Sequence, residues 1–193
     1  MDQVDETCCR PQRADALRNR GKILEAAEEI FAKEGISVPV DIVAERAGVG
    51  VGTLYRHFPT KEALFEAIVL TKLDELVEAT TVAEGDDAGG TFFDFLMRVA
   101  DEASLKHDLF DALTAAGIDV KSRCGYSVHE LETGIDRLRQ RAVDAGAVRG
   151  DVTTAEIMGL VISACRVMER PGVDKESTRQ MVGIICDGLR PRP

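Results

Sequence analysis

The apolar residues recur at steps of three and four along nearly the whole chain, and this periodicity constrains the fold more than any other feature. Proline and glycine are scarce inside the periodic stretches and gather at the junctions between them. Such a step places apolar side chains on one face of a helix, whereas a half-buried strand requires strict alternation. The pattern therefore predicts an all-α protein. About nine helices are expected, at approximately residues 15–34, 40–47, 51–58, 60–82, 91 onward, 108–116, 121–145, 153 to 171 and 174 onward.

Several residues at the junctions are the types that start or stop helices. Gly48 can adopt the left-handed backbone conformation that ends the second helix. Thr60 can cap the fourth helix, and Thr153 with Glu156 three residues later has the spacing of a capping box. Residues 83–90, AEGDDAGG, are expected to form a surface connection between helices.

The composition suits a chain that buries an ordinary core. With 193 residues, 45% hydrophobic and 30% charged, it can form one medium domain or two small ones. No stretch approaches the roughly 18 apolar residues of a spanning helix, and the first residues lack the order of a secretory signal. We therefore expect a cytoplasmic protein with no membrane partner.

The five cysteines show no repeated spacing, and no histidine is spaced with them as zinc ligands usually are. Cys165 and Cys186 lie within apolar helical patterns, where a reduced thiol behaves as a small hydrophobic group. The expectation is no disulfide framework, no metal site and no cofactor.

The net charge of −10 is unevenly distributed. Residues 1–61 carry 9 basic against 10 acidic side chains, whereas residues 62–193 carry 15 against 24. Five of the basic residues lie close together between Arg10 and Lys22. Any nucleic acid would therefore bind a restricted N-terminal surface, because the acidic remainder repels phosphate.

Two short helices joined by a glycine-containing turn, after a longer amphipathic helix, are what a helix-turn-helix DNA-binding motif requires. In PVDIVAERAGVGVGTLYRHF, the residues expected to pack inward are Val43, Ala47, Val51, Leu54 and Phe58. The polar residues left for a DNA groove are Thr53, Tyr55, Arg56 and His57, whose side chains can bond phosphate oxygens or base edges.

At these residues the chain resembles the tetracycline-repressor (TetR) family of bacterial transcriptional regulators. The resemblance covers residues 20–70 and rests on ILEAAEEIFAKEG and on IVAERAGVGVGTLYRHFPTKEALFEAIV. It implies a flexible basic arm at 1–14, a DNA-binding domain at 15–62 with its helix-turn-helix motif at about 39–58, and a helical effector-binding and dimerisation domain at 63–193.

The resemblance also implies particular DNA contacts. Val51, Gly52, Thr53, Tyr55 and His57 would face the major groove or its bordering phosphates, and Lys61 would hold a phosphate. A helical wheel adds Arg56 to this face, and the basic run between Arg10 and Lys22 adds Arg18 and Arg20. Relatives often carry Thr-Thr where this chain has Val38 and Pro39, but the backbone N–H groups of the second helix can still meet a phosphate there.

For the second part of the chain, the resemblance implies binding of a small-molecule effector and a homodimer formed through the last two helices. The expected effector-binding residues are Phe92, Phe95, Leu96, Phe110, Leu113, Tyr126, His129 and Met158. The expected dimer residues are Ile157, Leu160, Val161, Ala164, Met168, Met181, Ile184, Ile185 and Leu189. Aromatic and methionine residues at helical spacing more often belong to the core than to a ligand site. Effector binding would release a palindromic operator whose half-sites lie about 34 Å apart.

Other functions stay open at this point. An activator of the same family would carry the same residues. A thiol enzyme could use Cys124, His129 and Glu130, but no third residue holds the imidazole, and we expect no enzyme. A protein-interaction module would use the acidic part and ignore DNA. The glycines at 48, 50 and 52 follow a helix rather than the strand that a nucleotide fingerprint needs.

Overall fold

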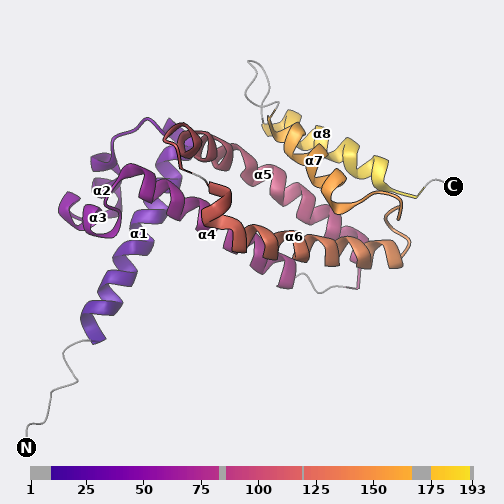
Figure 1. Ribbon diagram of the computed structural model, residues 1–193, viewed down its shortest axis with the longest axis horizontal. Coiled ribbons are helices and arrows are strands. Elements are labelled where there is room, and N and C mark those ends of the chain that lie inside the picture. The colour runs from indigo at the N-terminus through magenta and orange to yellow at the C-terminus, as the bar shows by residue number, and fades with distance from the viewer. Residues whose placement is uncertain (1–9, 83–85, 119, 167–174, 192–193) are drawn as a thin grey trace, which may run out of the picture. The chain divides into compact units, whose positions relative to one another are not determined.

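The computed structural model describes residues 10–82, 86–118, 120–166 and 175–191, and these residues form eight helices and no strands. The predicted all-α fold is confirmed. The chain divides into two compact units, Met1–Ile68 and Val69–Pro193, with the boundary inside α4 (Lys61–Val82) (Figure 1). The domain limits predicted at residues 14 and 62 stay predictions. Within the described ranges, no helix combines the length and apolar character needed to cross a membrane.

The first unit contains α1 (Arg10–Glu34), α2 (Val40–Ala47), α3 (Val51–His57) and the first turns of α4. α1 begins five residues earlier than Asp15, the start that the sequence indicated. As predicted, Gly48 ends α2 with a φ of 68°, a left-handed conformation in which its N–H reaches the Glu45 carbonyl at 3.0 Å. Thr60 caps α4, because its hydroxyl oxygen accepts the Ala63 N–H at 3.1 Å.

The core of the first unit is built where α1, α2 and α3 meet the start of α4. The rings of Phe31 and Phe65 pack edge to face, with 5.3 Å between their centroids. From α2 and α3, Val43 and Leu54 are buried, and so is Phe58 directly after α3. These three residues take the inward positions that the sequence predicted.

Val51 was expected to join this core, and that expectation is wrong: its side chain is 39% exposed. Val51 is the first residue of α3. Helical side chains lean toward the N-terminus of their helix, so the first side chain projects past the helix end rather than onto the core. Leu54 and Phe58 fill the inward side of α3 without it.

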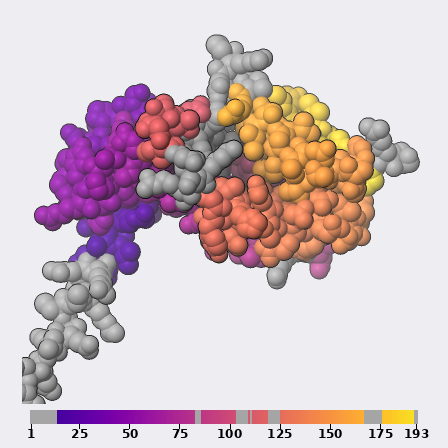
Figure 2. Space-filling model, in the orientation of Figure 1, coloured from indigo at the N-terminus to yellow at the C-terminus, as the bar shows by residue number. Residues whose placement is uncertain are grey.

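The second unit contains the rest of α4 with α5 (Ala88–Ala115), α6 (Val120–Asp144), α7 (Thr154–Arg166) and α8 (Lys175–Leu189). α5 lies alongside α6, α7 and α8 (Figure 1). In the space-filling view α6 and α7 cover one face of this unit together (Figure 2). The buried core includes Phe92, Phe95, Leu96, Leu138, Ile157 and Val182.

From residue 86 to 116 the structure differs from the expectation of a loop followed by two helices, and residues 83–85 of the expected loop lie outside the described residues. α5 begins at Ala88, three residues earlier than expected, because the Asp87 side chain accepts the Gly90 N–H at 2.8 Å. It then runs unbroken to Ala115, since no proline or glycine interrupts residues 91–115. Gly89 is required by packing, because a Cβ there would lie 2.5 Å from the Cβ of Ala147.

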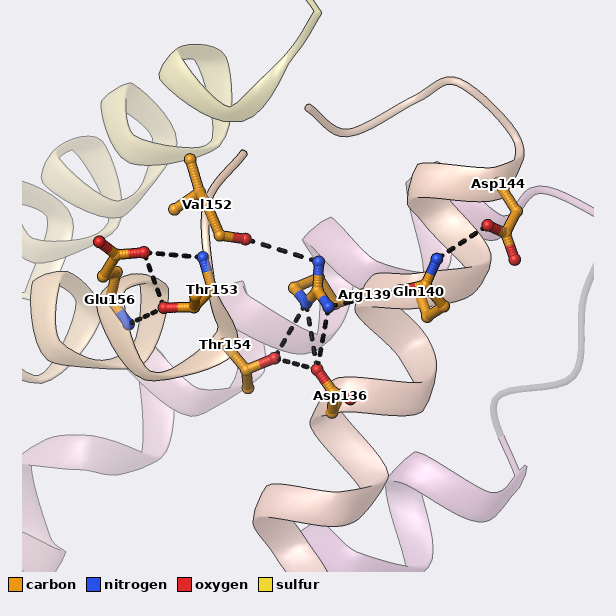
Figure 3. A network of polar contacts seen from close by, with 8 residues as sticks. All are labelled: Asp136, Arg139, Gln140, Asp144, Val152, Thr153, Thr154 and Glu156. Carbon is orange, nitrogen blue, oxygen red and sulfur yellow. Dashed lines mark hydrogen bonds and ion pairs between the residues drawn. The ribbon is translucent and has the colours of Figure 1, made fainter. Parts of the chain in front are cut away.

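The junction between α6 and α7 is held by a polar network (Figure 3). The predicted capping box is present: the Glu156 carboxylate accepts the Thr153 N–H at 2.8 Å. Arg139 donates to Asp136 at 3.1 Å and to the Thr154 hydroxyl at 3.0 Å, and Thr154 donates to Asp136. The hydrogen bond from Thr154, with Arg139 in support, lowers the pKa of Asp136.

Candidate nucleic-acid interface

α3 has one buried face and one open face. Leu54 is 1% exposed, whereas Tyr55 is 45% exposed and Gly52 and Arg56 are also exposed. Thr53 and His57 are half-buried at the edges of the open face. The structure therefore brings Val51, Gly52, Thr53, Tyr55, Arg56 and His57 together on one short helix, with the open side carrying both apolar and hydrogen-bonding groups.

The turn between α2 and α3 and the pairing of α2 with α1 set the direction of this helix. Arg46 on α2 donates to both oxygens of the Glu29 carboxylate on α1, from Nε at 3.1 Å and from Nη2 at 2.7 and 2.5 Å. This hydrogen bonding lowers the pKa of Glu29. The amino-acid sequence does not reveal this pair, because charged residues 17 positions apart give no local signal.

Lys61 is held against the turn that precedes α2. Its ammonium donates to the carbonyl of Val38 at 2.8 Å and lies 5.8 and 5.6 Å from the ring centroids of Phe31 and Phe65. Burial lowers the pKa of this amine. Pro39 follows as the residue before α2, which has no side-chain cap at its start. Lys61, Val38 and Pro39 are thus adjacent at the uncapped N-terminus of α2.

The basic residues selected on α1 have partners within the first unit. Arg18 forms an ion pair with Asp15 one turn earlier. The guanidinium of Arg20 lies 5.4 Å from the centroid of the Phe58 ring. Residues 1–9 of the expected basic arm lie outside the described residues. Arg20 therefore lies beside the end of α3, and the DNA contacts of both arginines stay predictions.

The expected effector-binding residues do not share one environment. Phe92, Phe95, Leu96 and Leu113 are buried, and Met158 packs partly buried against the core. Tyr126, in contrast, is 80% exposed, and His129 is also exposed. The side chain of Phe110 lies outside those that the structure describes. Their role in effector binding stays a prediction.

The expected dimer residues separate into two groups. Ile157, Val161, Ala164 and Leu189 are buried in the core of their own unit, and Met181 and Ile185 are partly buried against it. Leu160 on α7 and Ile184 on α8 are 53% and 65% exposed. Ile162, which sequence analysis missed, is 51% exposed. Met168 lies outside the described residues.

The sequence matches two family models over most of its length. Residues 23–68 match the model of bacterial regulatory proteins of the tetR family, and residues 87–191 match the C-terminal domain described as transcriptional regulator SbtR-like.

A curated relative supports the N-terminal part alone. An HTH-type transcriptional regulator of Staphylococcus aureus (strain USA300) is 40% identical over 63 residues. That match spans 32% of this chain, and the chain covers only about a third (34%) of the length of that relative.

Solved structures match nearly the whole chain. A TetR transcription regulatory protein from Mycobacterium vanbaalenii is 36% identical, with a TM-score of 0.75, over 94% of this chain and 100% of its own. A TetR transcriptional regulator from Streptomyces coelicolor is 29% identical, with a TM-score of 0.74, over 90% and 99%. The chain belongs to the TetR family of bacterial DNA-binding transcriptional regulators.

Proposed function

We propose that the protein is a homodimeric repressor that binds a palindromic operator through α3 and is released by a small-molecule effector. The observation that carries the proposal is the open face of α3, where Gly52, Tyr55 and Arg56 are exposed opposite the buried Leu54. Side chains of this kind on the second helix of such a motif can reach base edges and phosphates in the major groove. The repressor would act in the cytoplasm, where its operator DNA lies.

Contact with the phosphates is proposed at the start of α2. The uncapped N–H groups there carry the positive end of the helix dipole, and the Lys61 ammonium lies next to them. Arg20 would add a charge beside the end of α3. Each such cation that meets a phosphate releases a counterion, so operator binding is expected to weaken steeply as salt rises.

Dimerisation is proposed through the outer faces of α7 and α8. Leu160, Ile162 and Ile184 are aliphatic side chains more than half exposed on these two helices. Pairing with the same helices of a second copy would bury them and place two α3 helices about one DNA turn, roughly 34 Å, apart. The effector would bind within the second unit and favour a spacing that does not fit the operator, with a coupling of typically about 1–3 kcal/mol.

The test is a fluorescence-polarisation titration of the full chain with labelled DNA from the region flanking its own gene, at two salt concentrations. Tight binding that falls with salt is expected, and Tyr55→Ala should abolish it. Tyr126→Ala is the matched control, because Tyr126 is the other tyrosine of the chain and is 80% exposed in the second unit. Equal binding by Tyr55→Ala and the unmodified protein would refute the proposed role of α3.

A further inference from the structure

Val51 is an aliphatic side chain that the core of the first unit leaves partly exposed. It is 39% exposed at the first position of α3, while Leu54 and Phe58 complete the inward side of that segment. The residues before and after it are glycines, so an isopropyl group is the only side chain carried by residues 50–52. Residues 50–52 therefore present a small apolar projection without a side-chain hydrogen-bond donor or acceptor, and the first polar side chain after them is that of Thr53.

Gly52 is not explained by packing within the molecule. A Cβ at this position would meet no atom of the described residues within 4 Å, and the φ of Gly52 is not in the left-handed region that favours glycine. An exposed glycine inside a helix weakens the helix by roughly 0.5–1 kcal/mol relative to alanine. Lack of a side chain here leaves room for a surface outside the chain to approach the backbone of α3 closely, next to Val51.

The chemistry of this end of α3 selects among the groups that a DNA major groove presents. Base edges in that groove display hydrogen-bond donors and acceptors, with one apolar group among them, the 5-methyl of thymine. Contact between an isopropyl group and that methyl buries apolar surface and is favourable. The same isopropyl group placed against a base donor or acceptor would leave that polar group without a hydrogen-bond partner, which is unfavourable. Tyr55 and Arg56 on the open face of α3 differ from Val51, because their side chains carry polar groups of their own.

We propose that Val51 determines operator specificity by contacting the 5-methyl group of a thymine, at a close approach that Gly52 permits. This inference rests on the proposed function, because it requires that α3 enter the major groove. It adds the base feature that the leading end of the helix recognises, and it requires at least one thymine in each half-site.

The experiment begins with selection of binding sites from a random duplex library by the full-length protein. In the enriched duplex, each thymine is then replaced in turn by deoxyuridine, which lacks only the 5-methyl group, and the Kd is measured by fluorescence polarisation. One thymine position in each half-site should weaken binding about fourfold when replaced, as expected for one buried methyl group. Val51→Ala should also bind more weakly and should be insensitive to deoxyuridine at that position.

Ile42→Ala is the matched control for Val51. Ile42 is 44% exposed in the same unit, but it lines the groove between α1 and α2 together with Ile30 and Arg46. This variant should keep the full sensitivity to deoxyuridine. If no thymine is sensitive, or if Val51→Ala keeps the sensitivity of the unmodified protein, the inference is wrong while the proposed function stands.

Gly52→Ala tests the close approach separately. The variant should fold with a thermal midpoint at or above that of the unmodified protein, since the added methyl meets open space, and should lose at least tenfold in operator affinity. Gly125→Ala is its control, because Gly125 is exposed on α6 and also has open space around it, and its operator affinity should not change. Unchanged affinity in Gly52→Ala would overturn the close approach.

A library in which no duplex is enriched would overturn the proposed function and this inference with it.

Discussion

The ammonium group of Lys61 contacts both the turn before α2 and the aromatic pair in the core of the first unit. The group donates to the Val38 carbonyl at 2.8 Å and lies near the rings of Phe31 and Phe65. The carbonyl belongs to the turn before α2, so the bond ties the start of α4 to that turn. Two of the three donors of the ammonium remain for other acceptors, such as a phosphate oxygen.

Lys61→Met keeps the aliphatic stem and removes the charge. We expect a loss of about 1 kcal/mol in the free energy of unfolding, because the hydrogen bond to Val38 is lost. Operator affinity should fall, and the slope of log affinity against log salt should decrease by about one if the ammonium also meets a phosphate. Urea unfolding and salt-dependent fluorescence polarisation measure the two effects. A lower affinity with an unchanged slope would mean that Lys61 only positions α2.

At the scale of elements, α4 and α6 approach each other closely at Gly134. A Cβ added at Gly134 would lie 2.1 Å from Oγ1 and 2.7 Å from Cβ of Thr80, a residue that is 6% exposed. The Thr80 hydroxyl turns back to the Val77 carbonyl at 2.7 Å. Seven residues before Gly134, Ser127 donates to Asp74 on α4 at 2.9 Å. α4 and α6 thus meet at a polar contact between Ser127 and Asp74 and at a position where only glycine fits.

Gly134→Ala should separate these two helices and lower the free energy of unfolding by roughly 1–3 kcal/mol, the usual cost of overpacking. Adding Thr80→Ala should recover part of that loss, since it removes two of the three nearest atoms. Gly125→Ala, on the same helix in open space, should not destabilise the protein. Urea unfolding of the four proteins followed by circular dichroism gives the comparison. Equal stability of Gly134→Ala and Gly125→Ala would contradict the close approach.

At the scale of the whole molecule, the acidity of the second part limits where DNA can bind. The net charge of −10 is carried mainly by residues after 61, and the first 61 residues are nearly neutral. The DNA phosphates are therefore repelled by most of the chain. Repulsion is weakest at the nearly neutral first 61 residues, which contain α2 and α3. A dimer would carry two such regions, and its long-range repulsion would help to orient the DNA toward them.

Leu160→Glu combined with Ile184→Glu should convert the proposed dimer into a monomer, because each charge would have to be buried against an apolar partner surface. Sedimentation equilibrium should report the monomer mass, and operator affinity should fall at least a hundredfold through loss of bivalent binding. Val82→Glu is the control, because Val82 is 72% exposed on α4. The Val82→Glu variant should remain dimeric. A double variant with the mass of the unmodified protein would place the dimer interface elsewhere.

The amino-acid sequence by itself determined most helix limits in this protein. Gly48, Thr60 and Thr153 act within about four residues of their own positions, so the local sequence contains all that the cap requires. The same holds for the alternation of buried Leu54 and exposed Tyr55 on α3 and for the run that carries the family resemblance. These features depend on backbone geometry and on the helical period, which any short segment specifies.

Only the tertiary structure decided which apolar residues are buried and which contacts join distant segments. Val51 lies outside the core, and Leu160 and Ile184 lie outside while Ile157 and Val161 lie inside, although all five are aliphatic residues in helices. The bond from Lys61 to Val38, the contact of Gly89 with Ala147 and the crossing of Thr80 and Gly134 join positions more than 20 residues apart. The physical reason is that burial depends on what the rest of the chain brings against a helix face, which no local window of sequence contains.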